Sequence, residues 1–180
     1  SSRFKGSNDS EVIDGVKIIR KGNQYLSVQI AAFFYYFKNK NDIDFVIDQF
    51  HGLPFFTPFY VKKPKIALIQ EVAGKVWFLN SLPAPINWIV GMTGYLFEPW
   101  IFKFYKNTYF MTASESAKRG LERMGIDKEK ITIIQHGVTL PKKMNNYRKE
   151  RINTITYLGI ISKDKGIEDA ISCFKTLNKI

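Results

Sequence analysis

Short apolar segments alternate with longer amphipathic ones along most of this 180-residue chain. Four short runs rich in apolar and β-branched side chains predict strands, at residues 43–47, 65–69, 108–112 and 131–134. Residues 24–37 repeat bulky apolar side chains at helical spacing, and residues 88–105 form a longer aromatic helix that we expect to break near its glycines. Strands that alternate with helices predict an α/β protein, in which a parallel sheet has helices on both faces.

Smaller signals mark turns and helix ends. Residues 12–19 alternate around a central Asp-Gly turn and predict a pair of strands. Ser114 has the short polar side chain that caps a helix N-terminus, and Gly125 suits the end of the same helix because glycine readily adopts left-handed backbone conformations. Residues 54–60 predict a loop that leads into a short helical turn.

The last part of the chain repeats the strand–helix pattern around a lysine. Residues 154–158 predict a strand that ends at Gly159, and residues 167–177 predict an amphipathic helix that begins just after Lys165 and Gly166. A glycine turn, an ammonium group and a helix N-terminus together favour the binding of a phosphate. An ordinary strand–helix unit with a surface lysine accounts for the same residues, so the pattern alone leaves both interpretations open.

The composition is that of a folded protein with an excess of positive charge. Hydrophobic residues make up 45% of the chain and charged residues 24%, which is ordinary globular usage. Lys and Arg total 27 against 16 acidic residues, and the net charge of +11 favours anionic partners such as nucleotides or an anionic membrane. The aromatic residues do not interleave with arginine as stacking platforms do, so we expect no nucleic-acid partner. The single cysteine, Cys173, excludes an internal disulfide and favours a reducing, cytoplasmic location.

One region combines many aromatic residues with lysine. Its apolar stretch at residues 86–97 is too short and too often interrupted by polar residues to span a bilayer. The wider segment 77–102, flanked by Lys75, Lys103 and Lys106, favours contact with a membrane interface, where aromatic and basic side chains bind. A helix packed in the protein core accounts for the same aromatic residues, so both interpretations stay open.

Three turns that follow predicted strands resemble those of a known family. A Ser-Glu-Ser turn follows residues 108–112, a His-Gly-Val turn follows residues 131–134, and a Gly…Lys-Gly turn spans residues 159–166. In this order and spacing they resemble the middle of glycosyltransferase family 4, the retaining enzymes of the GT-B fold. The resemblance extends upstream through residues 2–6 and 48–56.

The resemblance implies a Rossmann-like parallel sheet of a GT-B fold. We expect residues 1–139 to form most of the N-terminal, acceptor-side domain without its first strand, and residues 140–153 to be an inter-domain linker. Residues 154–180 would be the first strand–helix unit of the C-terminal, donor-binding domain. The chemistry of the family also needs a glycine-rich loop after the first strand and a downstream Glu-x7-Glu region that holds the donor sugar and ribose, and neither is in this sequence. We therefore expect the chain to be an inactive fragment of such an enzyme.

The resemblance also implies where the donor binds. The implied donor-binding residues are Lys165, Gly159, Gly166 and Ser162. In the family this lysine grips the donor diphosphate together with an arginine, and Ile160 stands in the arginine position. Isoleucine in place of the family's arginine is a large change, because a guanidinium matches the geometry of a phosphate and an aliphatic side chain does not. Lys163 stands close enough in the sequence to compensate.

The implied acceptor-binding residues are His51, Gln70 and Glu71. Gln70 and Glu71 end the strand at residues 65–69, and the carboxyl ends of parallel strands line the ligand crevice. The family commonly has histidine in the place of Gln70. Glutamine can hydrogen-bond a sugar hydroxyl but cannot transfer a proton near neutral pH. Capping roles for these residues, and a turn-forming role for His136, are the structural alternatives.

Together these features predict a glycosyltransferase. The resemblance implies transfer of a sugar, with retention of configuration, from a nucleotide-sugar donor to a glycan or lipid-linked acceptor, as in polysaccharide biosynthesis. It implies no cofactor, no metal and no protein nucleophile, and it favours a cytoplasmic protein with peripheral contact at the inner membrane face. The alternatives are a GT-B nucleotide-sugar epimerase, or a non-enzymatic basic α/β module that binds polyanions or membrane.

Overall fold

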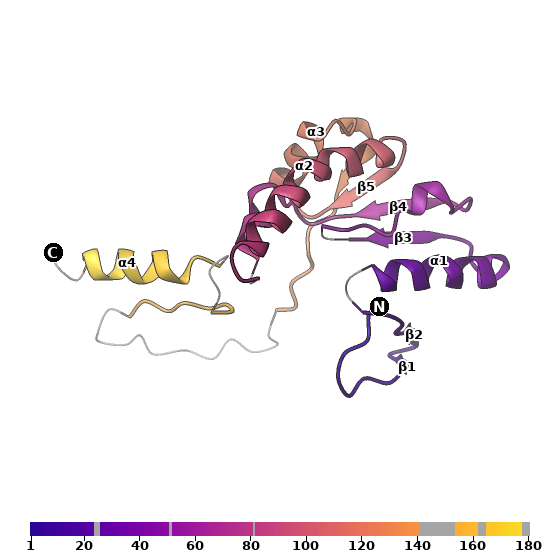
Figure 1. The fold of residues 1–180 in the computed structure, drawn as a ribbon, viewed down its shortest axis with the longest axis horizontal. Coiled ribbons are helices and arrows are strands. Elements are labelled where there is room, and N and C mark those ends of the chain that lie inside the picture. Colours follow the sequence, from indigo (N-terminus) through magenta and orange to yellow (C-terminus); the bar gives the residue numbers. More distant parts are fainter. Residues whose placement is uncertain (24–25, 51, 81, 141–153, 162–164, 178–180) are drawn as a thin grey trace. The chain divides into compact units, whose positions relative to one another are not determined.

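A four-stranded parallel sheet forms the centre of the fold. The computed structural model describes residues 1–23, 26–50, 52–80, 82–140, 154–161 and 165–177, whose helices and strands are drawn in Figure 1. The strands are β3 (Val46–Gln49), β4 (Lys65–Leu68), β5 (Tyr109–Thr112) and β6 (Ile131–Ile133). They pair in chain order, β3-β4-β5-β6, and every pair is parallel. The α/β class and the four predicted strands are therefore confirmed.

The first of these strands begins later than the predicted 43–47. The short 3-10 helix η1 (Lys40–Asp42) precedes it, and the ladder begins where the Val46 N–H donates to the Pro64 carbonyl at 3.0 Å. β4 lies between β3 and β5. None of its side chains is exposed, and Ala67 is fully buried. This explains why β4 lacks the polar–apolar alternation of a strand with one wet face.

Helices cover one face of the sheet. The C-terminal half of α2 (Ile86–Tyr105) and α3 (Glu115–Arg123) lie on the face that carries Ala67 and Phe110, while α1 (Ser27–Asn39) lies beside β3 (Figure 1). On the opposite face Ile47 is 57% and Tyr109 60% exposed, so the expected coverage of both faces is not found among the described residues. The core packs between the sheet and the helices α2 and α3. Its buried members are Phe50, Ala67, Ile69, Phe102, Tyr105, Phe110, Leu121, Ile126 and Ile131. Burial of each large side chain stabilises the fold by roughly 1.5–3 kcal/mol.

The ends of α3 are fixed by the residues that the sequence indicated. The Ala117 N–H donates to Ser114 Oγ at 3.1 Å, which caps the N-terminus. Gly125 has a φ of +86°, and the Ile126 N–H then donates to the Leu121 carbonyl at 3.1 Å. This is the Schellman arrangement, which satisfies carbonyls that would otherwise lack a partner at the helix end. The predicted cap at Ser114 and the predicted helix end at Gly125 are both confirmed.

The predicted break in α2 is wrong, because the helix runs without interruption from Ile86 to Tyr105. A Cβ placed on Gly91 would lie 2.7 Å from Cδ1 of Phe78, so this glycine permits a close contact. α2 contains two glycines, Gly91 and Gly94, and each costs a helix only about 1 kcal/mol, which packing can offset. Within the described ranges, no helix has the combination of length and apolar character that a bilayer crossing requires.

The N-terminal strands form the predicted hairpin. β1 (Ser10–Ile13) pairs antiparallel with β2 (Val16–Ile19). Asp14 and Gly15 connect them with φ values of 50° and 81°. Asp and Gly tolerate this left-handed conformation, and it matches the twist of the two strands.

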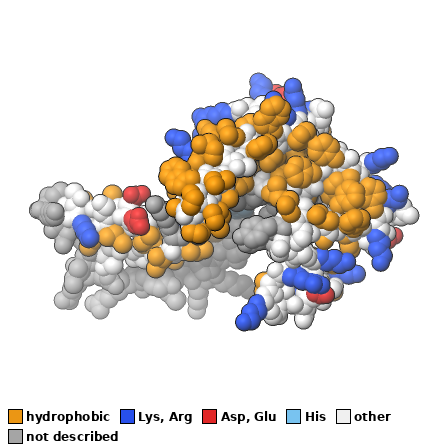
Figure 2. Space-filling model, viewed as in Figure 1, with side chains coloured by type: hydrophobic (Ala, Val, Ile, Leu, Met, Phe, Trp, Pro, Cys, Tyr) orange, Lys and Arg blue, Asp and Glu red, His pale blue; other side chains and the backbone are white. Residues whose placement is uncertain are grey.

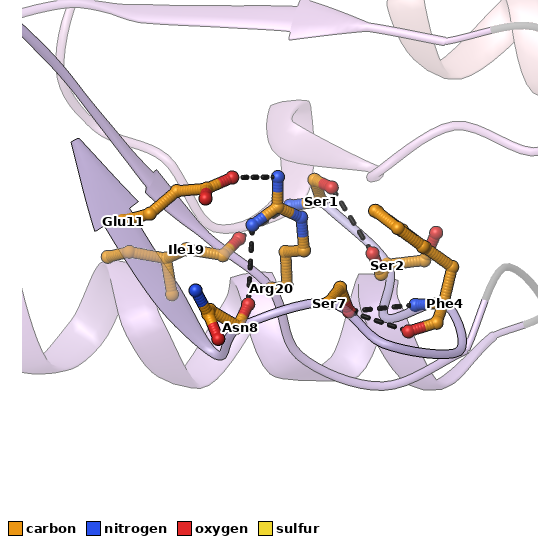
Figure 3. Close-up of polar contacts among 8 residues, drawn as sticks. All are labelled: Ser1, Ser2, Phe4, Ser7, Asn8, Glu11, Ile19 and Arg20. Atoms are coloured by element: carbon orange, nitrogen blue, oxygen red, sulfur yellow. Dashed lines mark hydrogen bonds and ion pairs between the residues drawn. The ribbon is translucent and has the colours of Figure 1, made fainter. Parts of the chain in front are cut away.

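Arg20, which follows the hairpin, ties it to the preceding segment. Its guanidinium is buried, forms an ion pair with Glu11 and donates to the Asn8 carbonyl at 3.3 Å (Figure 3). Beside it, Ser7 Oγ bonds to both backbone groups of Phe4 and closes a tight turn. The arginine therefore organises the hairpin and its leading loop as one structure.

The strand predicted at residues 154–158 does not form. Residues 154–161 are an irregular exposed segment, in which Leu158 is 97% exposed. A strand gains its hydrogen bonds from a neighbouring strand, and none of the described residues pairs with this segment. The helix that follows, α4 (Ile167–Leu177), forms as predicted.

Contacts divide the chain into two compact units. The first unit comprises Ser1–Gly74 with Gly94–His136, and the second comprises Lys75–Thr93 with Gly137–Ile180. The sheet, α1 and α3 belong to the first unit, and α4 belongs to the second. Most of the predicted linker, residues 141–153, lies outside the described residues.

Candidate functional site

A cleft of about 540 Å³ opens where β4 and β5 end in the first unit. Gln70 and Glu71, which follow β4, are exposed on one side of it, and the start of α3 forms the other. The lining residues are Gln70, Glu71, Val72, Gly74, Ser114, Ser116, Ala117, Gly120, Arg123 and Met124. In a parallel α/β sheet this edge is where ligands bind. The cleft is therefore the candidate functional site.

The α3 side of the cleft is rich in hydrogen-bond donors. The first N–H groups of a helix have no partner within the helix and carry the positive end of its dipole. Ser114 caps this end and Ser116 adds a second hydroxyl, while Arg123 contributes a guanidinium from the last turn. Such a wall can hold an anion or a hydroxyl-rich ligand.

The β4 side supplies acceptors. Glu71 contributes a carboxylate, and Gln70 contributes an amide that can both donate and accept hydrogen bonds. Ligand hydroxyl groups can donate to Glu71 and exchange hydrogen bonds with Gln70. The cleft thus pairs a donor wall with an acceptor wall, a combination that suits a polyhydroxylated molecule better than an apolar one.

A glycine brings the two walls close together. A Cβ placed on Gly120 of α3 would lie 3.2 Å from Cγ2 of Val72, which is tighter than ordinary van der Waals contact. A larger side chain at Gly120 would push α3 away from the segment after β4. Gly120 and Val72 therefore set the width of the cleft.

Glu98 of α2 holds the segment that follows Glu71. Its carboxylate is buried and accepts hydrogen bonds from the N–H groups of Ala73 at 2.8 Å and Gly74 at 2.7 Å. These bonds fix the backbone just past the cleft wall. Sequence reasoning did not assign Glu98 a role. The signal was a single carboxylate within a largely apolar 20-residue helix, since a buried charge requires partners.

A second hollow lies on the other side of Gln70. It has a volume of about 530 Å³ and is lined by Ser1, Ile47, Gln49, Phe50, Phe55, Leu68 and Gln70. Gln70 therefore contributes to both hollows at this edge of the sheet. His51, predicted to contact the acceptor, lies outside the described residues, so its place relative to this hollow stays a prediction.

The loop after β3 is held by a buried carboxylate. Asp48 Oδ2 accepts hydrogen bonds from Thr57 Oγ1 at 2.6 Å and from the Tyr105 hydroxyl at 2.5 Å. Burial and the neighbouring Asp48 carboxylate raise the pKa of Tyr105 far above its usual range. Burial, Asp48 and Tyr36 likewise raise the pKa of Tyr60 to about 12. Both tyrosines therefore stay protonated, and the Tyr105 hydroxyl acts as a donor to Asp48.

The predicted donor-binding residues lie in the second unit. Gly166 has a φ of +70° and stands just before α4, and Lys165 is exposed beside it. Gly159 packs against the Tyr157 ring, whose hydroxyl lies 3.2 Å from the carbonyl oxygen of Ile160 and 3.3 Å from that of Lys165. The Tyr157 hydroxyl thus lies beside two backbone carbonyls near the N-terminus of α4.

Three further predicted residues follow later in the chain. Ser162 and Lys163 lie outside the described residues. His136 is exposed in the extended segment after β6 and is not among the residues that line the cleft. Of the predicted set, the structure brings Gln70 and Glu71 together with Ser114 and Ser116 of the Ser-Glu-Ser turn.

The fold and cleft define an α/β protein with a polar site at the carboxyl edge of a parallel sheet. Comparison of the chain with protein-family models, with curated proteins and with solved structures gives no match. The family resemblance therefore rests on the residues of the turns themselves.

Proposed function

We propose that this protein is a retaining glycosyltransferase that uses a nucleotide-sugar donor and a glycan or lipid-linked acceptor. The single observation that carries the proposal is the meeting of two sequence motifs in one cleft. The Gln70-Glu71 pair and the Ser-Glu-Ser turn are far apart in the sequence, and Gln70, Glu71, Ser114 and Ser116 line the same hollow at the end of β4 and β5.

In this proposal the first unit binds the acceptor. Glu71 accepts hydrogen bonds from sugar hydroxyls and Gln70 fixes their orientation, while the donors at the start of α3 hold an anionic or hydroxylated group opposite. The protein contributes by positioning and by charge stabilisation. No side chain is assigned a nucleophilic role.

The second unit would hold the donor diphosphate. Lys165 and the N–H groups at the start of α4 supply positive charge and hydrogen-bond donors that suit a phosphate. Glu168 and Asp169 in the first turn of α4 compete for the same positive end, which favours a binding mode centred on Lys165. Ile160 supplies no such donor, so we expect weaker diphosphate binding than an arginine would give.

The test is sugar transfer by the protein expressed from its complete reading frame. The protein is incubated with a panel of nucleotide-sugars and with glycan or lipid-linked acceptors, and the anomeric configuration of the product is determined by NMR. We expect a retained linkage, and a loss of roughly 10- to 100-fold in kcat/KM for Glu71→Gln, because a positioning hydrogen bond is lost. Glu122→Gln on the exposed face of α3 is the matched control and should change neither rate nor product.

Binding of the donor is measured separately. Titration with nucleoside diphosphates compares Lys165→Ala with Lys175→Ala, which removes the same charge from the last turn of the same helix. Only Lys165→Ala should weaken the binding of nucleoside diphosphates. Sugar isomerisation without an acceptor would replace the proposal with an epimerase. Salt-sensitive binding to any polyanion, with no turnover of the panel, would replace it with a non-enzymatic module.

A further inference from the structure

Aromatic side chains from three elements of the first unit form one exposed surface. α1 contributes Phe33 and Phe37, whose ring centroids are 4.8 Å apart, and the Phe33 ring lies 4.9 Å from that of Tyr60. Next to Tyr60, Phe59 of η2 (Thr57–Phe59) packs against Phe104 of α2 with ring centroids 4.8 Å apart. These contacts connect α1 to α2 through the segment around η2.

The surface continues along α2. Phe97, Trp100 and Phe104 recur at spacings of three and four residues, so they share one face of this helix. We call the whole set the aromatic surface. Its members are Phe33, Phe37, Phe59, Tyr60, Phe97, Trp100 and Phe104. In Figure 2 hydrophobic side chains crowd over α2, with lysine and arginine side chains around them.

Most of the aromatic surface is open to water. Phe59 is 63% exposed, Phe97 62% and Trp100 57%. Soluble proteins rarely expose large contiguous apolar patches, and such patches usually mark a binding surface. Phe33, Phe37 and Tyr60 contact one another, as do Phe59 and Phe104, unlike the single exposed apolar residues that occur on any protein.

Lysines surround this surface. Lys40, Lys62 and Lys63 line a hollow of about 480 Å³ together with Phe33, Phe37, Phe59 and Tyr60, and no acidic residue is among the lining side chains. Lys103 Nζ lies 3.9 Å from the centroid of the Trp100 ring. The aliphatic stem of a lysine can lie along apolar surface while its ammonium reaches outward. The nearest acidic side chains in the sequence, Asp42 and Asp44, follow Lys40, and Glu98 is buried and bonded to the backbone.

We propose that the protein binds anionic membranes through the aromatic surface and its lysines. Tryptophan and tyrosine favour the boundary between headgroups and acyl chains, and lysines attract anionic headgroups. Nucleic acid is the less suitable occupant because Phe33 packs against Tyr60 and Phe59 against Phe104, so these rings are not arranged as separate platforms for successive bases. This inference is independent of the proposed enzymatic function, since it uses none of the residues in the cleft.

The test is flotation of the protein with vesicles. Vesicles of phosphatidylcholine alone are compared with vesicles that also contain phosphatidylglycerol, and tryptophan fluorescence reports insertion. We expect binding only to the anionic vesicles. The variant Phe59→Ser/Trp100→Ser should weaken it roughly 10- to 100-fold by removing apolar contact. The variant Lys62→Gln/Lys63→Gln/Lys103→Gln should weaken it by roughly 100-fold or more.

Two control variants separate this surface from general effects. Lys17→Gln/Lys21→Gln/Lys128→Gln removes the same charge from exposed positions elsewhere, and Val138→Ser/Leu140→Ser removes other exposed apolar side chains. Both should bind like the parent protein, and circular dichroism should show that all variants are folded. The proposal is overturned if the parent protein does not float with anionic vesicles, or if the controls lose as much binding as the surface variants. Binding to RNA without binding to vesicles would assign the surface to nucleic acid instead.

Discussion

The backbone N–H of Gly74 donates to Oε2 of Glu98 at 2.7 Å, across 24 residues of sequence. The same carboxylate accepts from the neighbouring Ala73 N–H, so two backbone donors depend on one buried side chain. Glu98→Gln keeps the size but replaces one acceptor oxygen with an amide donor that faces an N–H. We expect a loss of about 1–3 kcal/mol in the free energy of unfolding. Urea denaturation measures this change in the free energy of unfolding.

Glu122→Gln serves as the control for that substitution, because Glu122 is exposed on α3. It should change stability by less than about 0.5 kcal/mol. Equal stability of the two variants would mean that the hydrogen bonds of Glu98 contribute nothing that glutamine cannot replace.

Tyr105→Phe tests the buried network around Asp48. The substitution removes the hydroxyl that donates to Asp48 Oδ2 and leaves the ring in the core. A buried carboxylate that loses a donor is destabilised, and we expect a cost of about 1–3 kcal/mol. Tyr109→Phe, at an exposed position in β5, should lower the free energy of unfolding only slightly. If both substitutions had the same small effect in urea denaturation, the Tyr105 hydroxyl would not stabilise the native state.

Alkaline pH should weaken the fold through Tyr60. Its pKa is raised from 10.0 to about 12 in the folded chain, so the native state holds this proton more tightly than the unfolded state does. Below pH 10 the stabilisation is fully present, and it is lost as the pH rises through 12. We expect the free energy of unfolding to fall across this interval, and to fall less steeply in Tyr60→Phe. Denaturation curves recorded at several pH values provide the measurement, and parallel profiles for the two proteins would contradict it.

Gly91→Ala should disturb the contact between α2 and Phe78. The new Cβ would lie 2.7 Å from Cδ1 and 3.1 Å from Cα of Phe78, so the backbone there must move. Overpacking costs about 1–3 kcal/mol, and alanine returns up to about 1 kcal/mol of helix propensity. We expect a net loss on the order of 1 kcal/mol. A change in tryptophan fluorescence should accompany it, since the Phe78 ring contacts Trp88 at 5.9 Å between centroids.

Gly137→Ala is the control for Gly91→Ala, since nothing lies within 4 Å of a Cβ at that position. Its fluorescence and stability should match those of the parent protein. An unchanged spectrum in Gly91→Ala as well would show that η3 (Gly74–Leu79) adapts without cost.

Local patterns predicted much of the first unit. The apolar run at residues 65–69 identified β4 as a strand inside the sheet, because a strand with no exposed side chain favours apolar residues. Ser114 and Gly125 marked both ends of α3, since each satisfies backbone groups within a few residues of itself. These features depend on short-range hydrogen bonds and periodicity, which a sequence displays directly.

Other features depend on distant parts of the chain and could not be predicted. Residues 154–158 have strand propensity but form no strand, because a ladder needs a neighbour that propensity does not supply. The uninterrupted course of α2 depends on the fit of Gly91 against Phe78, and the role of Glu98 depends on two backbone donors far upstream. For the candidate site, the sequence placed Gln70 and Glu71 at the end of a strand but not opposite Ser116 and Arg123.

The order of the parallel strands matches their order along the chain, β3-β4-β5-β6. Each strand therefore adds beside the one synthesised just before it, with a single intervening connection to close. The entropy of closing a connection grows only slowly with its length, so even the long segment from Leu68 to Tyr109 adds little cost, and a chain emerging from the ribosome can build the sheet progressively from one side. Assembly of the cleft must then wait for α3, which follows β5. The protein can acquire most of its sheet during synthesis, before its candidate binding site exists.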